Sequence, residues 1–244
     1  MTPNSSPPPR GRGKEGVGPK EGVGLRGEGA AVIFDMDGVL IDSGALHRRA
    51  WRALLDELGA RPAHPEFWRL TIGRPGEEAI PILLGRAVSA EEARRLARRK
   101  RDLYVGLARS GLEAVPGAAA FVMALNRLGV PRAVGTSASR FDCERLLDGL
   151  GLRRHFNVIV TADDVSLGKP DPEVYVEAAR RMRATPAACV VFEDSVVGIQ
   201  AARSAGMRAI GVTTAHTEEE LRAAGAESAI ADFEGLEWRM LARP

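Results

Sequence analysis

The stretch Ala30–Gly38, which reads Ala-Ala-Val-Ile-Phe-Asp-Met-Asp-Gly, carries the strongest information about the fold. Its run of five apolar residues is typical of a strand that is buried on both faces of a parallel sheet. Asp35 and Asp37 follow this run at once, and Gly38 favours a turn there. In an open α/β sheet, ligands bind beyond the carboxyl ends of the strands. The stretch therefore predicts both a strand and a polar site at its end.

Short apolar runs separated by helix-like stretches continue to the C-terminus, and this alternation is typical of an α/β fold. We predict a Rossmann-like, mostly parallel sheet with helices on both faces. Helix signals include Ser195 before an amphipathic stretch that ends at Gly206, and Thr217 with Glu220 at the spacing of a capping box. The predicted strands are Ala30–Phe34, Arg132–Thr136, Val158–Val160, Cys189–Phe192, Ala209–Val212 and, at one edge, Ser228–Ala231.

Nearly a hundred residues separate the first two predicted strands, whereas a simple crossover needs far fewer. The apolar periodicity in this interval indicates helices at 44–58 and, from Ser89 with Glu92 as a capping box, at about 89–107. We therefore predict a helical cap at residues 44–114. The cap is inserted into an α/β core formed by residues 30–43 and 115–244.

Residues 1–29 differ in composition from the rest of the chain. They hold eight Gly and five Pro, and the string Lys-Glu-Gly-Val-Gly occurs twice. Such a segment cannot bury enough apolar surface to order itself. We expect a disordered tail and assign it no role.

The whole chain has 244 residues, of which 45% are hydrophobic and 27% charged, as expected for a soluble globular protein. Because 34 Lys and Arg nearly balance 32 Asp and Glu, charge gives no reason to expect a nucleic-acid partner. No apolar run approaches the roughly 20 residues that span a bilayer, and no membrane or protein partner is implied. Cys143 and Cys189 cannot make a disulfide framework, which favours a cytoplasmic location.

Polar side chains follow other predicted strands as the two aspartates follow the first. A hydroxyl pair ends the second strand, an acidic pair follows the fourth, and a lysine lies in a turn-rich Gly-Lys-Pro-Asp-Pro segment. Because the carboxyl ends of parallel strands lie at one edge of the sheet, we expect these groups to converge. The expected cluster comprises Asp35, Asp37, Thr136, Ser137, Lys169, Glu193 and Asp194.

Clustered carboxylates repel one another unless a cation lies among them. Hard oxygen ligands with no His or Cys nearby favour Mg²⁺, so we expect a magnesium ion and a phosphate-bearing substrate. Lys169, the Thr136 hydroxyl and the Ser137 amide suit the phosphate oxygens. Asp35 is placed to attack phosphorus, and Asp37 to protonate the leaving oxygen and then deprotonate the attacking water.

The combination resembles the haloacid dehalogenase superfamily, in the subgroup of β-phosphoglucomutase and small-metabolite phosphatases. The motifs that match, across residues 31 to about 232, are Asp35-Met36-Asp37-Gly38-Val39, Thr136 after a strand, Lys169 in Gly-Lys-Pro, and Glu193-Asp194-Ser195. The resemblance implies Asp35 as the nucleophile and Asp37 as the acid/base. The implied metal ligands are Asp35, Asp37 through its backbone carbonyl, Asp194, and Glu193 either directly or as an adjacent partner.

Three cap residues are candidates for contact with the substrate. His47 corresponds in the resemblance to a mutase histidine beside the acid/base, and a helix-surface histidine is the alternative. Lys100 lies where the family places a cap lysine, within a basic run that otherwise reads as a solvated face. Arg74 lies in a cap loop in which Gly76 replaces the phosphate-gripping arginine of the mutase. We interpret Trp68 as a packing residue.

We therefore predict a Mg²⁺-dependent phosphatase that hydrolyses a small phosphorylated metabolite, such as a sugar or polyol phosphate, through an aspartyl-phosphate on Asp35. A β-phosphoglucomutase-type phosphomutase is the first alternative. His47 and Lys100 favour it, whereas Gly76 argues against it. A non-catalytic binding module is the second alternative, and the complete set of chemical positions argues against it.

Overall fold

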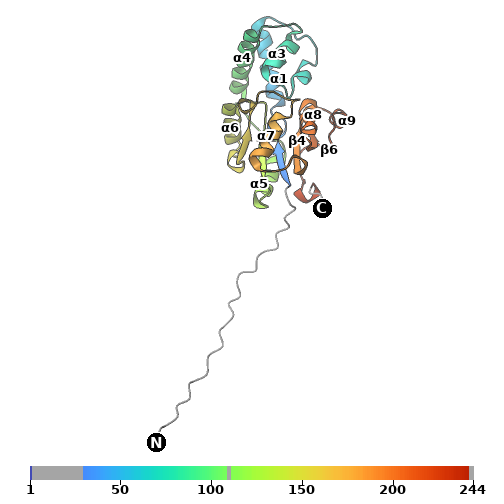
Figure 1. Cartoon of the computed structure of the whole chain (residues 1–244). Coiled ribbons are helices and arrows are strands. Elements are labelled where there is room, and N and C mark those ends of the chain that lie inside the picture. The colour runs from blue at the N-terminus through green and yellow to red at the C-terminus, as the bar shows by residue number, and fades with distance from the viewer. Residues whose placement is uncertain (2–29, 109–110, 242–244) are drawn as a thin grey trace.

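The computed structural model describes Met1, residues 30–108 and residues 111–241. Apart from Met1, the predicted tail at 1–29 lies outside the described residues. Within them, six parallel strands form one sheet in the order β3-β2-β1-β4-β5-β6 (Figure 1). The strands are β1 (Ala31–Phe34), β2 (Arg132–Gly135), β3 (Val158–Val160), β4 (Cys189–Glu193), β5 (Arg208–Val212) and β6 (Ser228–Ile230).

The strand order reverses beside β1, because the chain first builds β2 and β3 on one side of it and then β4, β5 and β6 on the other. Such a switch point opens a crevice at the carboxyl ends of the central strands. Every pairing is parallel, so the predicted fold class is confirmed. Five of the six predicted strands differ from the observed ones by one residue at one end. The difference at β4 affects the site, since Glu193 pairs in register with Gly211 and is the last residue of the strand, not the first residue after it.

Helices cover both faces of the sheet, which explains the uninterrupted apolar run in β1. Val32 and Phe34 belong to one core cluster, and Ala31 and Ile33 belong to the other. Figure 1 shows the helices of the core around the sheet. They are α5 (Ala118–Arg127), α6 (Arg140–Gly149), α7 (Glu173–Met182), α8 (Val196–Ser204) and α9 (Glu218–Ala223).

Among the described residues between β1 and β2, four further helices form a separate layer above the carboxyl ends of the strands (Figure 1). They pack around their own apolar cluster, which includes Trp51, Leu54 and Ile80. The helices fall within the range expected for the cap, and residues 44–114 remain our proposed extent of it. The helices are α1 (Gly44–Leu58), α2 (Phe67–Thr71), α3 (Gly76–Leu84) and α4 (Ala90–Ala108).

Of the two capping boxes predicted from the sequence, one is complete and the other is only half formed. Thr217 and Glu220 form a complete capping box at α9. At α4, Ser89 Oγ accepts a hydrogen bond from the Glu92 amide at 3.1 Å, but the Glu92 carboxylate pairs with Arg86 at 2.7 Å. The second half of the capping box predicted there is therefore wrong, because an arginine reaches the carboxylate.

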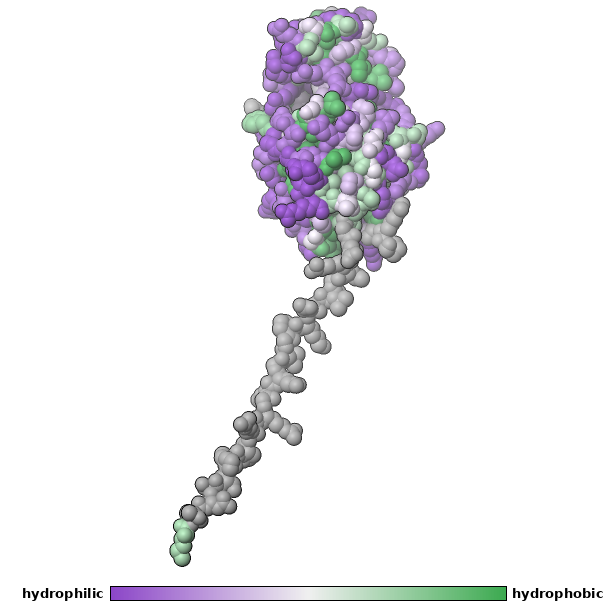
Figure 2. Space-filling model, viewed as in Figure 1, coloured by the Kyte–Doolittle hydropathy of each residue, from purple (hydrophilic) through white to green (hydrophobic). Residues whose placement is uncertain are grey.

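The face drawn in Figure 2 is mainly hydrophilic, and its apolar residues are scattered. None of the described helices has the length and apolar character needed to cross a membrane. The cytoplasmic location expected from the sequence stays a prediction.

Phe34 offers a direct test of the core, because its ring is fully buried and stacks on Phe192 with centroids 5.3 Å apart. Phe34→Ala should lower the free energy of unfolding by about 3–5 kcal/mol, since it leaves a cavity between the sheet and its helices. Urea denaturation at an unchanged m-value would measure this loss. The control is Phe141→Ala, whose ring is 65% exposed. Equal losses for the two variants would contradict the packing described.

Candidate active site

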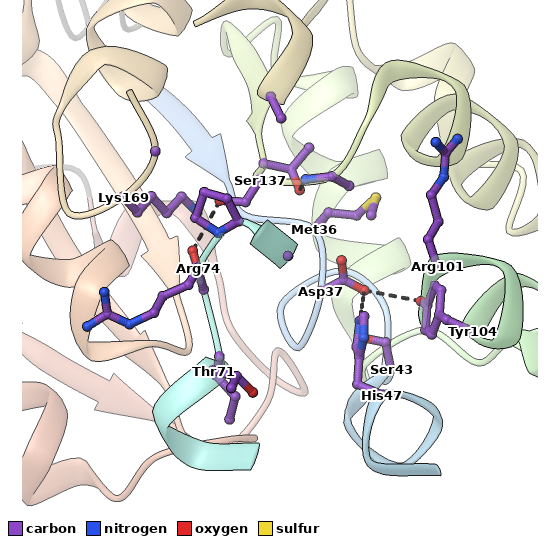
Figure 3. A pocket seen from close by; sticks show the side chains of 18 of the residues that line it. Met36, Asp37, Ser43, His47, Thr71, Arg74, Arg101, Tyr104, Ser137 and Lys169 are labelled. Carbon is purple, nitrogen blue, oxygen red and sulfur yellow. Dashed lines mark hydrogen bonds and ion pairs between the residues drawn. The ribbon is translucent and has the colours of Figure 1, made fainter. Parts of the chain in front are cut away.

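A cavity of about 640 Å³ lies between the strand ends and the cap (Figure 3). Its volume suits a small-molecule ligand. Glu193 is the one residue predicted for the site that does not line the cavity, because it is buried beneath it. The predicted residues that line the cavity are Asp35, Asp37, Thr136, Ser137, Lys169 and Asp194 from the core, and His47, Arg74 and Lys100 from the cap.

Lys169 is held between two carboxylates at the floor of the cavity. Its Nζ donates to Asp35 Oδ1 and to Glu193 Oε1, each at 2.7 Å, and its side chain is 1% exposed. The hydroxyl of Tyr175 also donates to Glu193 Oε1, at 3.1 Å. A buried ammonium with two such partners is fixed in place, and it neutralises part of the negative charge beside Asp35.

Glu193 uses its second oxygen to anchor the turn that follows β4. Oε2 accepts hydrogen bonds from the Ser195 amide at 2.6 Å and from Ser195 Oγ at 2.9 Å. The start of α8 lies so close that a Cβ atom on Gly198 would come within 1.7 Å of Glu193 Oε1. Because both carboxylate oxygens already accept hydrogen bonds, Glu193 orients Lys169 and the Asp194 turn.

Asp194 lies beside the loop that follows β1. Gly38 has φ +76°, and a Cβ atom there would be 1.9 Å from Asp194 Oδ2, so only glycine fits at this position. Thr214 joins the two loops, because its Oγ1 donates to the Gly38 carbonyl at 2.6 Å and lies 3.4 Å from Asp194 Oδ2. The ring Nδ1 of His216 lies 2.9 Å from the Asp194 carbonyl oxygen.

Three buried carboxylates thus gather at one place. Asp35, Glu193 and Asp194 each offer an oxygen, and these atoms lie within 4.8 Å of one another. Burial raises the pKa of Asp35 to about 7, with Lys169 opposing the shift and Glu193 adding to it. Burial and the charges of Glu193 and Asp35 raise the pKa of Asp194 well above its usual range. One ammonium does not balance three carboxylates, so the cluster fits a hard cation such as Mg²⁺.

Asp37 points toward His47 and Tyr104 of the cap (Figure 3). Its Oδ1 lies 3.1 Å from His47 Nε2, and Lys100 Nζ lies 2.6 Å from His47 Nδ1. When the ammonium donates to Nδ1, the ring proton is on Nε2 and points at the carboxylate. Burial alone would raise the pKa of Asp37, but attraction and hydrogen bonding to His47 lower it to about 2. Burial lowers the pKa of Lys100 to about 8.

Sequence reasoning missed one donor in this group. Tyr104, on the same helix as Lys100, donates its hydroxyl to Asp37 Oδ1 at 3.2 Å. Its ring stacks on the ring of His47 with centroids 4.1 Å apart and planes 7° apart. The spacing of Lys100 and Tyr104, four residues along a predicted helix, was the signal that could have found it.

The phosphate candidates at the end of β2 lie at the cavity wall. Thr136 is buried, and its Oγ1 accepts a hydrogen bond from the Ala138 amide at 3.1 Å. Ser137 Oγ donates to the carbonyl of Gly73 at 3.1 Å, so it connects the core to a cap loop. Cap and core are also joined by ion pairs between Arg101 and Asp142 and between Arg69 and Glu220.

Trp68 packs against the apolar cluster of the cap, as predicted, and it also lines the cavity. The Arg48 guanidinium lies 5.0 Å from its ring centroid. Arg74 also lines the cavity, but its Nε donates to the Leu70 carbonyl at 3.2 Å and its guanidinium lies 4.0 Å from Glu78. Arg74 is therefore engaged by its own cap segment.

The chain belongs to the haloacid dehalogenase-like hydrolase family, whose profile matches residues 30–206. It is 36% identical to a fructose-1-phosphate phosphatase of Escherichia coli, over 75% of this chain and 96% of that protein. It is also 33% identical to a chloroplastic 5-amino-6-(5-phospho-D-ribitylamino)uracil phosphatase of Arabidopsis thaliana. That match covers 79% of this chain and 52% of the plant protein. A β-phosphoglucomutase structure from Clostridium difficile superposes with a TM-score of 0.78 at 25% identity, over 88% of this chain and 96% of that one.

Asp194→Asn tests the carboxylate cluster. Mg²⁺ at a hundred times its Kd should raise the free energy of unfolding of the unaltered protein by about 2.7 kcal/mol, because it binds only the folded state. The variant should lose most of this gain, since it loses a charged ligand. Thermal unfolding in Mg²⁺ and in EDTA would measure both. If Mg²⁺ stabilised the variant as much as the unaltered protein, Asp194 would not be a metal ligand.

The same variant has an expected pH signature in EDTA. The pKa of Asp194 in the folded protein lies above its value of 3.8 in the unfolded chain. The carboxyl therefore contributes fully to the free energy of unfolding below pH 3.8, and this contribution is lost as the pH rises through the folded pKa. Asp194→Asn should therefore make the free energy of unfolding less dependent on pH above about 4. If the free energy of unfolding of the variant depended on pH as steeply as that of the unaltered protein, the pKa of Asp194 would not be raised by its surroundings.

Proposed function

We propose that the protein is a Mg²⁺-dependent phosphatase of small phosphorylated carbohydrates that works through an aspartyl-phosphate on Asp35. The observation that carries this proposal is the placement of Asp35 at the cavity floor, fixed by a buried ammonium and beside a second buried carboxylate. A cavity closed by a cap suits a small substrate better than a folded phosphoprotein. The family and the named sugar-phosphate phosphatase relative support the same class of reaction.

The metal requirement is part of this proposal. The carboxylates of Asp35 and Asp194, with the backbone carbonyl of Asp37, would hold Mg²⁺, while Glu193 supports them through Lys169 and Ser195. When bound, Mg²⁺ screens the repulsion between the attacking carboxylate and the phosphate oxygens.

The residues of the chain then divide the work of two half-reactions. In the first, an Asp35 oxygen forms a bond to phosphorus as the bond to the leaving oxygen breaks, and Asp37 gives that oxygen a proton. In the second, Asp37 takes a proton from the water that cleaves the aspartyl-phosphate. Lys169, Thr136 and the Ser137 amide hold the phosphate oxygens. Although the pKa of Asp37 is about 2 without substrate, an approaching phosphate anion raises it.

A phosphomutase is the second candidate, because His47 lies 3.1 Å from Asp37 and Lys100 lies 2.6 Å from His47. The likeness to a β-phosphoglucomutase structure also favours it. The cap loop argues for the phosphatase, since Gly76 begins α3 and the nearby Arg74 is engaged by the Leu70 carbonyl. No arginine at the expected position therefore grips a second phosphate.

The test is phosphate release from a panel of sugar phosphates in Mg²⁺ and in EDTA, with β-glucose 1-phosphate also assayed for glucose 6-phosphate. We expect free phosphate that disappears with EDTA and with Asp35→Asn, because the nucleophile and the metal are both required. Asp148→Asn, on the exposed surface, is the matched control and should keep full activity. Glucose 6-phosphate without free phosphate would establish the mutase instead. Full activity of Asp35→Asn would contradict the assigned nucleophile.

A further inference from the structure

Tyr104 is a buried cap residue whose hydroxyl reaches into the core. Its side chain is 5% exposed, and α4 carries it over the loop that follows β1. The hydroxyl donates to Asp37 Oδ1 at 3.2 Å (Figure 3). A buried phenol needs a hydrogen-bond partner, and the partner of Tyr104 is the carboxylate that donates and accepts the proton in the proposed reaction.

We propose that Tyr104 is a positioning residue for Asp37, whose hydroxyl holds one carboxylate oxygen so that the other faces the reacting phosphate. The inference rests on the proposed function, in which Asp37 is the acid and base.

Two donors converge on the same oxygen of Asp37. His47 comes from α1 and Tyr104 from α4, and both contact Oδ1, at 3.1 and 3.2 Å. A carboxylate held by one donor can still turn about that contact, whereas donors on two different elements fix its plane. The fixed orientation leaves Oδ2 to carry the proton that moves.

The ring of Tyr104 has a second part in the same arrangement. It lies parallel to the imidazole of His47, with centroids 4.1 Å apart, and Lys100 Nζ lies 5.3 Å from the phenol centroid. Stacking restrains the plane of the imidazole, so that Nε2 stays directed at Asp37. The hydroxyl and the ring therefore act on the acid/base directly and through its histidine.

The proton balance keeps Tyr104 outside the transfer itself. As an Asp35 oxygen bonds to phosphorus, the bond between phosphorus and the leaving oxygen breaks, and the Oδ2 proton of Asp37 moves to that oxygen. In the second half-reaction the water oxygen bonds to phosphorus, the bond from Asp35 to phosphorus breaks, and the water proton returns to Asp37. Tyr104 keeps its own proton throughout, so its loss should weaken proton delivery without removing the acid.

Tyr104→Phe separates this role from packing, because it keeps the ring and removes only the hydroxyl. The rate of Asp35 phosphorylation should be measured by rapid quench with two substrates, fructose 1-phosphate and 2,4-dinitrophenyl phosphate. The sugar alkoxide needs a proton to leave, whereas dinitrophenolate does not. We expect the rate with the sugar phosphate to fall about 10- to 100-fold and the rate with the aryl phosphate to change less than about twofold.

Two companion variants make the result decisive. Asp37→Asn should slow phosphorylation by the sugar phosphate even more, again with little effect on the aryl phosphate. Tyr104→Leu, which also removes the ring, should lower the rate with the sugar phosphate further than Tyr104→Phe does. Equal losses on both substrates, or no loss on either, would overturn the role of Tyr104. A lack of leaving-group selectivity in Asp37→Asn would overturn the acid role of Asp37 itself, so failure of the inference and failure of the proposed function give different results.

Discussion

The rest of the site depends on one buried ammonium, that of Lys169, between Asp35 and Glu193. Placing these charges out of water is costly, and only close pairing with hydrogen bonds offsets the cost. The parallel sheet makes the pairing possible, because β1 and β4 are neighbours and both end at the same edge. The switch point of the sheet thus fixes the position of Asp35, the proposed nucleophile, before any substrate arrives.

The two aspartates of the first loop are separated in role by what surrounds them. Asp35 belongs to the carboxylate cluster, whose unbalanced charge suits a cation. Asp37, two residues on, faces the cap and receives hydrogen bonds from His47 and Tyr104. Gly38 makes this division possible, since its left-handed backbone lets the loop turn closely past Asp194. In the proposed mechanism the core therefore supplies the nucleophile and the metal ligands, while the cap orients the acid/base.

Much of this arrangement could be predicted from the sequence, because apolar runs and the polar residues after them are local signals. The run before Asp35 correctly predicted the central strand, and the long gap after it predicted inserted helices. The partners of those residues could not be predicted, since contacts such as Tyr104 with Asp37 join residues 67 positions apart. Trp68 shows the same limit, because only the tertiary structure reveals that this packing residue of the cap also lines the cavity.

The central claim is that the phosphoryl group passes through Asp35. The most direct measurement is to quench the enzyme during turnover of a sugar phosphate, reduce it with borohydride, and map the modified residue by mass spectrometry. Borohydride converts an aspartyl-phosphate to homoserine, so the account predicts homoserine at position 35 and unmodified aspartate at position 37. Modification at position 37, or at neither position while phosphate is released, would contradict it.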